Sequence, residues 1–320
     1  TECCYAAEAL GRIGPGAVEA VPALLTSAAH DDCREEACQA VARIGIQALP
    51  AILSVLGKES ETQPAVRNAA LKAMMAFGPA AKDALPRLIE IAQGENSDLV
   101  RPAIRVLGRI GPDAKEVVPL LVSILEKALA EDSGPAEEAT EALGRIGNAT
   151  SSTTLILLRA AGSRNVGIRA HAVLALGRAG EKNDVVLAAA RKALKDEEDI
   201  VRVFAALTFV HLGIKDKEVT RNLTVVSHYA TPFVSSLQGF PDEIKALMPA
   251  LIRALTMQNT ATADIACKLL GELDAEAAAP AAMALKTFIN EVTHADTVSY
   301  QERGYLLRDA MEVLHKIEPQ

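Results

Sequence analysis

The feature that most constrains this chain is a short motif that recurs about every 33 residues. Its best copies read Leu-Gly-Arg-Ile-Gly, and their last glycines are Gly14, Gly45, Gly78, Gly111, Gly147, Gly180 and, in a looser copy, Gly213. Successive glycines stand 31, 33, 33, 36, 33 and 33 residues apart. A near-constant period of this length indicates a stacked array in which each unit packs against its neighbours.

Each unit predicts a helical hairpin. The terminal glycine stands where a helix has to stop, because glycine adopts the left-handed backbone conformation without a Cβ clash. In three units a proline follows directly and prevents continuation of the helix. In three units another proline lies eight residues after the glycine, where it opens or kinks the next helix. These two sets are Pro15, Pro79 and Pro112, and Pro22, Pro86 and Pro119.

The composition agrees with an all-helical array. Half of the 320 residues are hydrophobic, only 3% are aromatic and tryptophan is absent, so the apolar content consists of small and medium aliphatic side chains suited to close helix packing. The formal net charge is −8, and neither residues 1–213 nor residues 214–320 are net basic. Binding to duplex DNA needs clustered lysine and arginine, so this balance disfavours nucleic acid without excluding a local basic stripe.

The five cysteines form no regular framework. They are Cys3, Cys4, Cys33, Cys38 and Cys267. We interpret them as small buried residues of a protein in a reducing compartment. A zinc site is not expected, because no histidine stands at metal-ligand spacing beside Cys33 and Cys38. No run of about 18 apolar residues predicts a membrane span. The sequence starts inside a repeat, which indicates a piece of a longer protein; a cytoplasmic location is favoured, although an export signal could have been lost.

These motifs resemble HEAT repeats, especially the short form found in phycobilisome-lyase-like repeat proteins. The family pattern places a Val-Arg pair at the start of the second helix, followed by Ala-x-x-Ala-Leu-Gly-x-x-Gly. The pair occurs as Val66-Arg67, Val100-Arg101, Ile168-Arg169 and Val201-Arg202, with Cys33-Arg34 as a near match. The resemblance implies an all-α fold, a right-handed α-α superhelix (a HEAT-type α-solenoid) of about eight helical hairpins.

The predicted organisation has three parts. Residues 1–213 are regular repeats, a leading half-repeat at 1–14 followed by six repeats. Residues 214–246 are an aromatic-containing insertion or a degenerate repeat, and residues 247–320 are two diverged repeats. Both interpretations of 214–246 stay open. If it is an insertion, four of its residues are candidate partner contacts, because aromatic side chains anchor interfaces: His228, Tyr229, Phe233 and Phe240.

Two columns of arginines follow the repeat. The turn arginines begin the second helices: Arg34, Arg67, Arg101, Arg169 and Arg202. The resemblance implies a structural ladder in which each ties a turn carboxylate to the neighbouring repeat, with Asp32, Asp98 and Asp199 close enough in sequence to serve. The end arginines stand two residues before the terminal glycine: Arg12, Arg43, Arg109, Arg145 and Arg178.

The end arginines have two interpretations. A cation in the last helical turn offsets the negative end of the helix macrodipole. Alternatively, second helices line the concave face of a HEAT superhelix, and a stripe of arginines there suits an acidic peptide or a phosphate backbone. The first is favoured, because Ala76 and His211 interrupt the column and the net charge is negative.

We therefore predict a non-catalytic protein-binding scaffold, a repeat domain of a larger protein, whose partner is another protein or peptide. No activated nucleophile, phosphate-binding loop or pair of histidines at ligand spacing indicates an enzyme, and no cofactor is expected. The alternatives are a chromophore- or ligand-handling protein like the bilin lyases that share the motif, and a weak nucleic-acid binder that uses the end arginines.

Overall fold

The computed structural model describes residues 2–30, 33–57, 62–94, 96–131, 134–147, 150–180, 182–214, 219, 237, 241–256, 260–294 and 300–318. All regular elements in these ranges are α-helices or 3-10 helices, and none is a strand. The chain divides into two compact units, Thr1–Ala160 and Ala161–Gln320.

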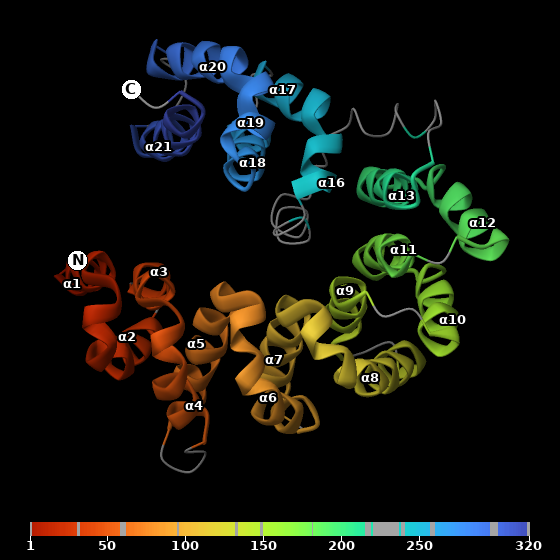
Figure 1. The fold of residues 1–320 in the computed structure, drawn as a ribbon, viewed down its shortest axis with the longest axis horizontal. Coiled ribbons are helices and arrows are strands. Elements are labelled where there is room, and N and C mark those ends of the chain that lie inside the picture. Colours follow the sequence, from red (N-terminus) through yellow and green to blue (C-terminus); the bar gives the residue numbers. More distant parts are fainter. Residues whose placement is uncertain are drawn as a thin grey trace. The chain divides into compact units, whose positions relative to one another are not determined.

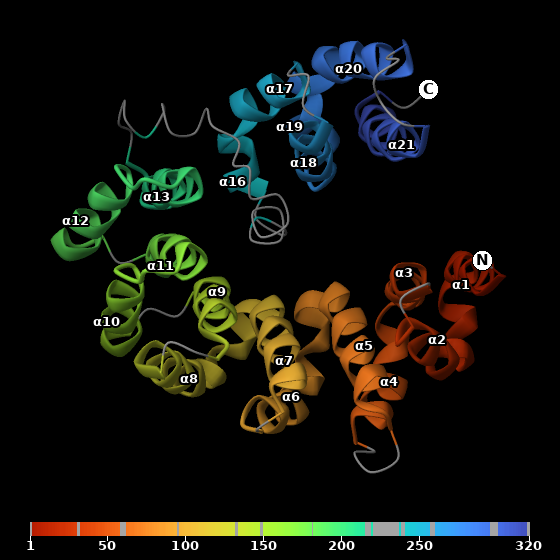
Figure 2. The same ribbon diagram turned by 180° about the vertical axis from the view of Figure 1, so that it is seen from behind.

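The first unit alternates the two kinds of helix that the repeat predicts. Its second helices are α1 (Glu2–Ile13), α3 (Arg34–Ile44), α5 (Pro64–Met74), α7 (Ser97–Ile110) and α9 (Ala136–Ile146). Its first helices are α2 (Val21–Ala28), α4 (Leu49–Gly57), α6 (Leu85–Ala92), α8 (Val118–Glu131) and α10 (Ser151–Ala160). Short 3-10 helices join them: η1 (Gly14–Ala20), η3 (Gly45–Ala48), η4 (Met75–Ala84) and η5 (Gly111–Val117). Figures 1 and 2 show α3, α5 and α7 in one layer and α2, α4 and α6 in another.

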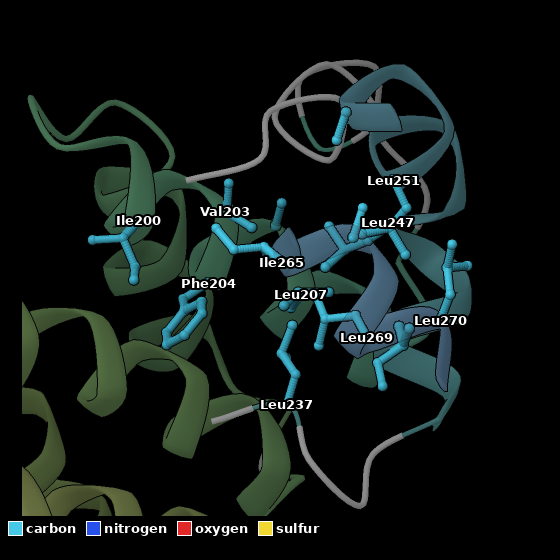
Figure 3. Close-up of a cluster of buried hydrophobic side chains, with 14 of the residues drawn as sticks. Ile200, Val203, Phe204, Leu207, Leu237, Leu247, Leu251, Ile265, Leu269 and Leu270 are labelled. Carbon is cyan, nitrogen blue, oxygen red and sulfur yellow. The ribbon is translucent and has the colours of Figure 1, made fainter. Parts of the chain in front are cut away.

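The second unit continues with the same kind of helix pair. Its elements are α11 (Val166–Ala179), α12 (Asp184–Ala193), α13 (Asp199–His211), α16 (Pro241–Ala246), α17 (Met248–Thr256), α18 (Thr260–Gly271), α19 (Ala275–Ala278), η6 (Ala279–Ala281), α20 (Ala282–His294) and α21 (Tyr300–Ile317). Its core gathers side chains from α13, α17 and α18, among them Phe204, Leu251 and Leu269 (Figure 3).

The predicted insertion is described only in part. Val219 and Leu237 are buried in the core of the second unit, and residues 241–246 form α16. The four candidate contacts His228, Tyr229, Phe233 and Phe240 lie outside the described residues.

All seven terminal glycines have positive φ, and six of them stand within two residues of the end of a second helix, as predicted. Gly78 differs, because α5 ends at Met74 and Gly78 lies within η4 at a non-helical position. Gly147 and Gly180 are in the left-handed helical region, with φ/ψ of 67°/22° and 76°/5°. Gly45 and Gly111 differ from the expectation: their φ/ψ of 83°/−159° and 73°/−143° belong to an extended region that is essentially restricted to glycine. The extended form leads directly into the 3-10 helix that precedes the next first helix.

The prolines eight residues after the terminal glycines open the first helices. Pro22 and Pro86 stand in the first turns of α2 and α6. Pro102 is different, because it lies inside α7, where it cannot donate a hydrogen bond to the carbonyl of Asp98 four residues earlier. The side-chain amide of Asn68, on α5, donates to that carbonyl instead, at 2.7 Å. The neighbouring repeat therefore satisfies the acceptor that Pro102 leaves without its helical partner.

The first glycine of the motif has a separate role. A Cβ added at Gly11 would lie 3.0 Å from Ala40 Cα, one at Gly108 would lie 2.9 Å from Ala142 Cα, and one at Gly177 would lie 2.7 Å from Thr208 Cα. These separations leave no room for a side chain. In these three pairs, α1 with α3, α7 with α9 and α11 with α13, the second helices therefore touch backbone to backbone at this position.

One stretch, Arg34–Gly57, is long and apolar enough to cross a membrane by length and composition alone. In the described structure it is two separate helices, α3 at the end of one repeat and α4 at the start of the next, separated by Gly45 and η3.

Candidate binding site on the second helices

Two of the turn arginines, Arg169 and Arg101, form hydrogen bonds to the following repeat. Arg169 donates to both carboxylate oxygens of Asp196, with Nε–Oδ2 and Nη2–Oδ1 distances of 2.8 and 2.9 Å. Burial raises the pKa of Asp196, but hydrogen bonds from Arg169 and from the Glu198 N–H outweigh it and hold the pKa below its ordinary value of 3.8. Arg101 donates to Glu138, at 3.1 and 3.2 Å, and to the carbonyl of Gly134, at 2.8 Å.

The other turn arginines are placed differently. Arg202 pairs with Asp199 on its own helix and donates to the carbonyls of Asp196 and Glu197. Arg67 is buried and Arg34 is exposed. Asp32 lies outside the described residues. The acceptors Glu138 and Asp196 were therefore missed by sequence reasoning, which sought a single aspartate position in every turn. Whether the column acts as a ladder throughout stays a prediction.

Glu138 is shared by two arginines of α7. Arg105 Nη2 lies 3.1 Å from Glu138 Oε1, beside the contacts of Arg101. The Glu138 side chain is 5% exposed, whereas those of Arg101 and Arg105 are 47% and 52% exposed. One buried carboxylate thus orients two half-exposed guanidinium groups, and the cluster keeps a net positive charge at the surface.

The end arginines of the first unit range from exposed to buried. Arg12 pairs with Glu8 at 2.7 Å and its side chain is 73% exposed. Arg43 is exposed and Arg109 is half-buried. Arg145 pairs with Glu141 at 2.9 Å and its side chain is only 6% exposed. The expected stripe of exposed arginines therefore does not extend to Arg145, because α9 is almost completely covered by its neighbours.

The last end arginine holds a buried carboxylate. Arg178 Nε and Nη2 lie 2.9 and 3.0 Å from the two oxygens of Glu243, on α16, and His211 Nε2 contacts the same carboxylate. The side chains of Arg178 and Glu243 are 4% and 1% exposed, so Arg178 is not on an exposed stripe either. Burial raises the pKa of Glu243, but the His211 hydrogen bond and the Arg178 charge hold it below 4.5. No motif in the sequence pointed to Glu243.

One group of cations in the first unit lies on three adjacent second helices. Arg43 on α3, Lys72 on α5 and Arg101 and Arg105 on α7 are exposed, and Arg109 on α7 is half-buried. Arg101, Arg105 and Arg109 are spaced four residues apart, so they share one side of α7. We name these five residues the α3–α7 basic face. Sequence reasoning missed Lys72 and Arg105, although each stands four residues before the column of end arginines.

Acidic side chains surround this face without covering it. On α3 and α7 the acidic residues stand in the first helical turn: Glu35 and Glu36 on α3, and Asp98 on α7. Helix α5 carries none. Beyond α7, Glu137 and Glu141 lie half-buried on α9. The basic face is therefore a bounded patch on an otherwise acidic chain.

The described residues contain no group of three or more His, Cys, Asp or Glu side chains arranged to hold a metal ion. The chemistry that the basic face offers is hydrogen bonding and charge pairing with an anion.

Comparison with family models agrees with the repeat architecture. Residues 18–108 match the family described as HEAT repeats. A search of curated proteins found no match. Among solved structures, an engineered protein is 18% identical over 98% of this chain and 95% of its own, with a TM-score of 0.43. Importin beta is 17% identical over 95% of this chain and 46% of its own, with a TM-score of 0.47. Human deoxyhypusine hydroxylase is 20% identical over 84% of this chain and 96% of its own, with a TM-score of 0.35.

Superpositions this loose say nothing about function, and the chain corresponds to less than half of importin beta. The family match, the period near 33 residues and the alternation of first and second helices agree with one another. Residues 18–108 are HEAT repeats, and the described residues have the all-α fold of a HEAT-type solenoid.

Proposed function

We propose that this chain is a non-catalytic scaffold that holds an acidic segment of another protein against the α3–α7 basic face. The observation that carries the proposal is the gathering of five cations on three adjacent second helices of a chain whose net charge is −8. A positively charged patch on a negatively charged chain attracts an acidic partner selectively, because the net negative charge of the rest of the chain repels the same partner.

The chain's own ion pairs support carboxylates as the preferred ligand. Arg101 and Arg105 together hold Glu138 on this face, and Arg178 holds Glu243 in the second unit through two nitrogens, one to each carboxylate oxygen. Arginine forks match the planar carboxylate and form two parallel hydrogen bonds to it. Side chains of the second helices are therefore placed to take a carboxylate.

The limits of the face favour a peptide over a nucleic acid. Adjacent helices pack about 8–10 Å apart, so three second helices span roughly 20 Å between their outer axes. The first-turn carboxylates Glu35, Glu36 and Asp98 stand at one end of the face, and Glu137 and Glu141 follow on α9. A continuous phosphate backbone would meet these carboxylates, whereas a short peptide can place its charges between them.

The proposal is tested by titrating the protein with a fluorescein-labelled peptide in which glutamate alternates with serine. The matched variants are Arg43→Gln with Lys72→Gln on the basic face, and Lys115→Gln with Lys127→Gln on η5 and α8. All four residues are exposed, and both double variants remove the same charge. We expect the first pair to weaken binding about fivefold, from ~1 kcal/mol of lost pairing, and the second to leave it within about twofold.

Two further arms separate the alternatives. A peptide with glutamine in place of glutamate should not bind, and added salt should weaken binding of the glutamate peptide. Equal loss in both double variants would mean that only the net charge matters and would overturn the proposal. Tighter binding of duplex DNA than of the peptide at equal salt would favour the nucleic-acid alternative instead.

A further inference from the structure

Three of the five cysteines come together at the start of the chain, although they are far apart in sequence. Cys3 and Cys4 stand in the first turn of α1, and Cys33 directly precedes α3. The Sγ atoms of Cys4 and Cys33 lie 3.1 Å apart. Cys33 is buried, Cys4 is half-buried and Cys3 is exposed. The proposed binding function uses none of these thiols.

The packing of the two helices fixes this thiol pair. At the other end of α1, Gly11 meets Ala40 of α3 with no room for a side chain, and these residues are 29 apart in sequence. Cys4 and Cys33 are also 29 apart. The two second helices thus run side by side in one register, and the backbone contact at Gly11 holds the register that aligns the sulfurs.

We propose that Cys4 and Cys33 are a redox-active dithiol, a modification site that small-molecule disulfides convert to an intrachain disulfide between α1 and the start of α3. The sulfurs must approach by only about 1 Å to reach the 2.03–2.05 Å of an S–S bond. Half-buried Cys4 is the thiol of the pair that a reagent in solution reaches, and buried Cys33 is the thiol that resolves the intermediate.

The reaction is two thiol–disulfide exchanges. The Cys4 thiolate attacks one sulfur of the small disulfide, an S–S bond forms between them, and the other half leaves as a thiolate that takes up a proton. The Cys33 thiolate then attacks Cys4 Sγ, the Cys4–Cys33 bond forms, and the second half leaves in the same way. The protein loses two electrons and two protons, and the small disulfide gains both as it becomes two thiols.

The neighbouring thiols oppose ionisation of the resolving thiol before the reaction begins, and one of them stops doing so once the mixed disulfide has formed. Hydrogen bonds with Cys3 and Cys4 are the main causes that raise the pKa of Cys33 to about 12. The Cys4 contribution to this raised pKa depends on its thiol, which the mixed disulfide removes. Cys3 is a competitor for the reagent, because hydrogen bonds with Cys33 and Ser27 lower its pKa and it is exposed.

The test is to equilibrate the folded chain with oxidised glutathione, block free thiols with iodoacetamide, digest with trypsin without reduction and identify linked peptides by mass spectrometry. Cleavage after Arg12 and Arg34 places Cys4 in residues 1–12 and Cys33 in residues 13–34. We expect these two peptides to be linked, with a mass two hydrogens below their sum, and reduction to separate them.

Two variants assign the bond to Cys4, since residues 1–12 also contain Cys3. Cys3→Ser alters an exposed thiol and should leave the linkage intact, whereas Cys4→Ser should lose it. Circular dichroism checks that each variant keeps the helix content of the parent. A linkage that persists in Cys4→Ser but is lost in Cys3→Ser would assign the disulfide to Cys3. Mixed disulfides with glutathione that do not go on to form the Cys4–Cys33 bond would show that the two sulfurs are not placed to react with each other. Either result overturns the proposal.

Discussion

Replacing Gly177 with alanine perturbs the tightest of the three glycine contacts between second helices. The added Cβ would lie 2.7 Å from Thr208 Cα and 3.0 Å from Thr208 Cγ2, whereas carbon atoms at optimal contact are about 3.5–4.0 Å apart. Helices α11 and α13 would therefore have to separate by about 1 Å. Thr208 cannot turn away, because its hydroxyl donates to the carbonyls of Val173, at 2.7 Å, and Phe204, at 3.0 Å.

Two opposing effects set the magnitude. Overpacking in a tightly packed core costs about 1–3 kcal/mol, and the anchored Thr208 places Gly177→Ala near the upper limit. Alanine in a helix interior stabilises the helix by about 1 kcal/mol relative to glycine. The net expectation is a loss of about 2 kcal/mol in the free energy of unfolding. Gly304→Ala is the matched control: Gly304 is exposed on α21 of the same unit with nothing within 4 Å of an added Cβ, so it should gain about 0.5–1 kcal/mol.

Urea denaturation followed by circular dichroism measures both variants. A Gly177→Ala protein as stable as the parent, or one that gains stability as Gly304→Ala does, would refute the inference that successive second helices touch backbone to backbone.

Two further substitutions test contacts between repeats. Glu243→Gln removes the charge that Arg178 and His211 share and should cost about 3 kcal/mol at neutral pH. The pKa of Glu243 in the folded state lies below 4.5, so the stability that its charge contributes is complete above pH 4.5 and is lost as the pH falls through the folded-state pKa. The difference between the urea midpoints of the parent and the variant should therefore shrink in acid. A difference that does not depend on pH would contradict this interpretation. Asn68→Ala should cost about 1 kcal/mol in the parent but much less in the Pro102→Ala background, whose new backbone N–H can bond the Asp98 carbonyl itself. If Asn68→Ala lowers the free energy of unfolding by the same amount in the parent and in Pro102→Ala, the double-mutant cycle would show that Asn68 does not compensate for Pro102.

The regular part of the fold could be predicted from the sequence because the helix stops are local. Every terminal glycine except Gly78 stops a second helix through its own backbone conformation, and a proline near the start of a first helix acts just as locally. The extended conformation of Gly45 and Gly111 could not be predicted, since both conformations need a positive φ and only the following 3-10 helix distinguishes them.

The binding site was predicted less completely, because pairing and burial depend on neighbouring repeats. The five end arginines are equivalent in the sequence, yet Arg12 is largely exposed and Arg178 is covered through contacts with Glu243, 65 residues away. Lys72 and Arg105 join the exposed face through helix spacing, a signal that was present in the sequence. The Cys4–Cys33 contact became visible only when the register of α1 and α3 was known.

The central claim, that the second helices of the first unit carry the binding face, is tested most directly by zero-length cross-linking of the glutamate peptide. A carbodiimide joins a carboxylate only to an amine in direct contact, so the linked lysine reports where the peptide lies. The account predicts that the peptide is joined to Lys72, on α5, and not to Lys115 and Lys127, which are also exposed. Links spread evenly over the three lysines, or links at Lys127 without Lys72, would contradict it.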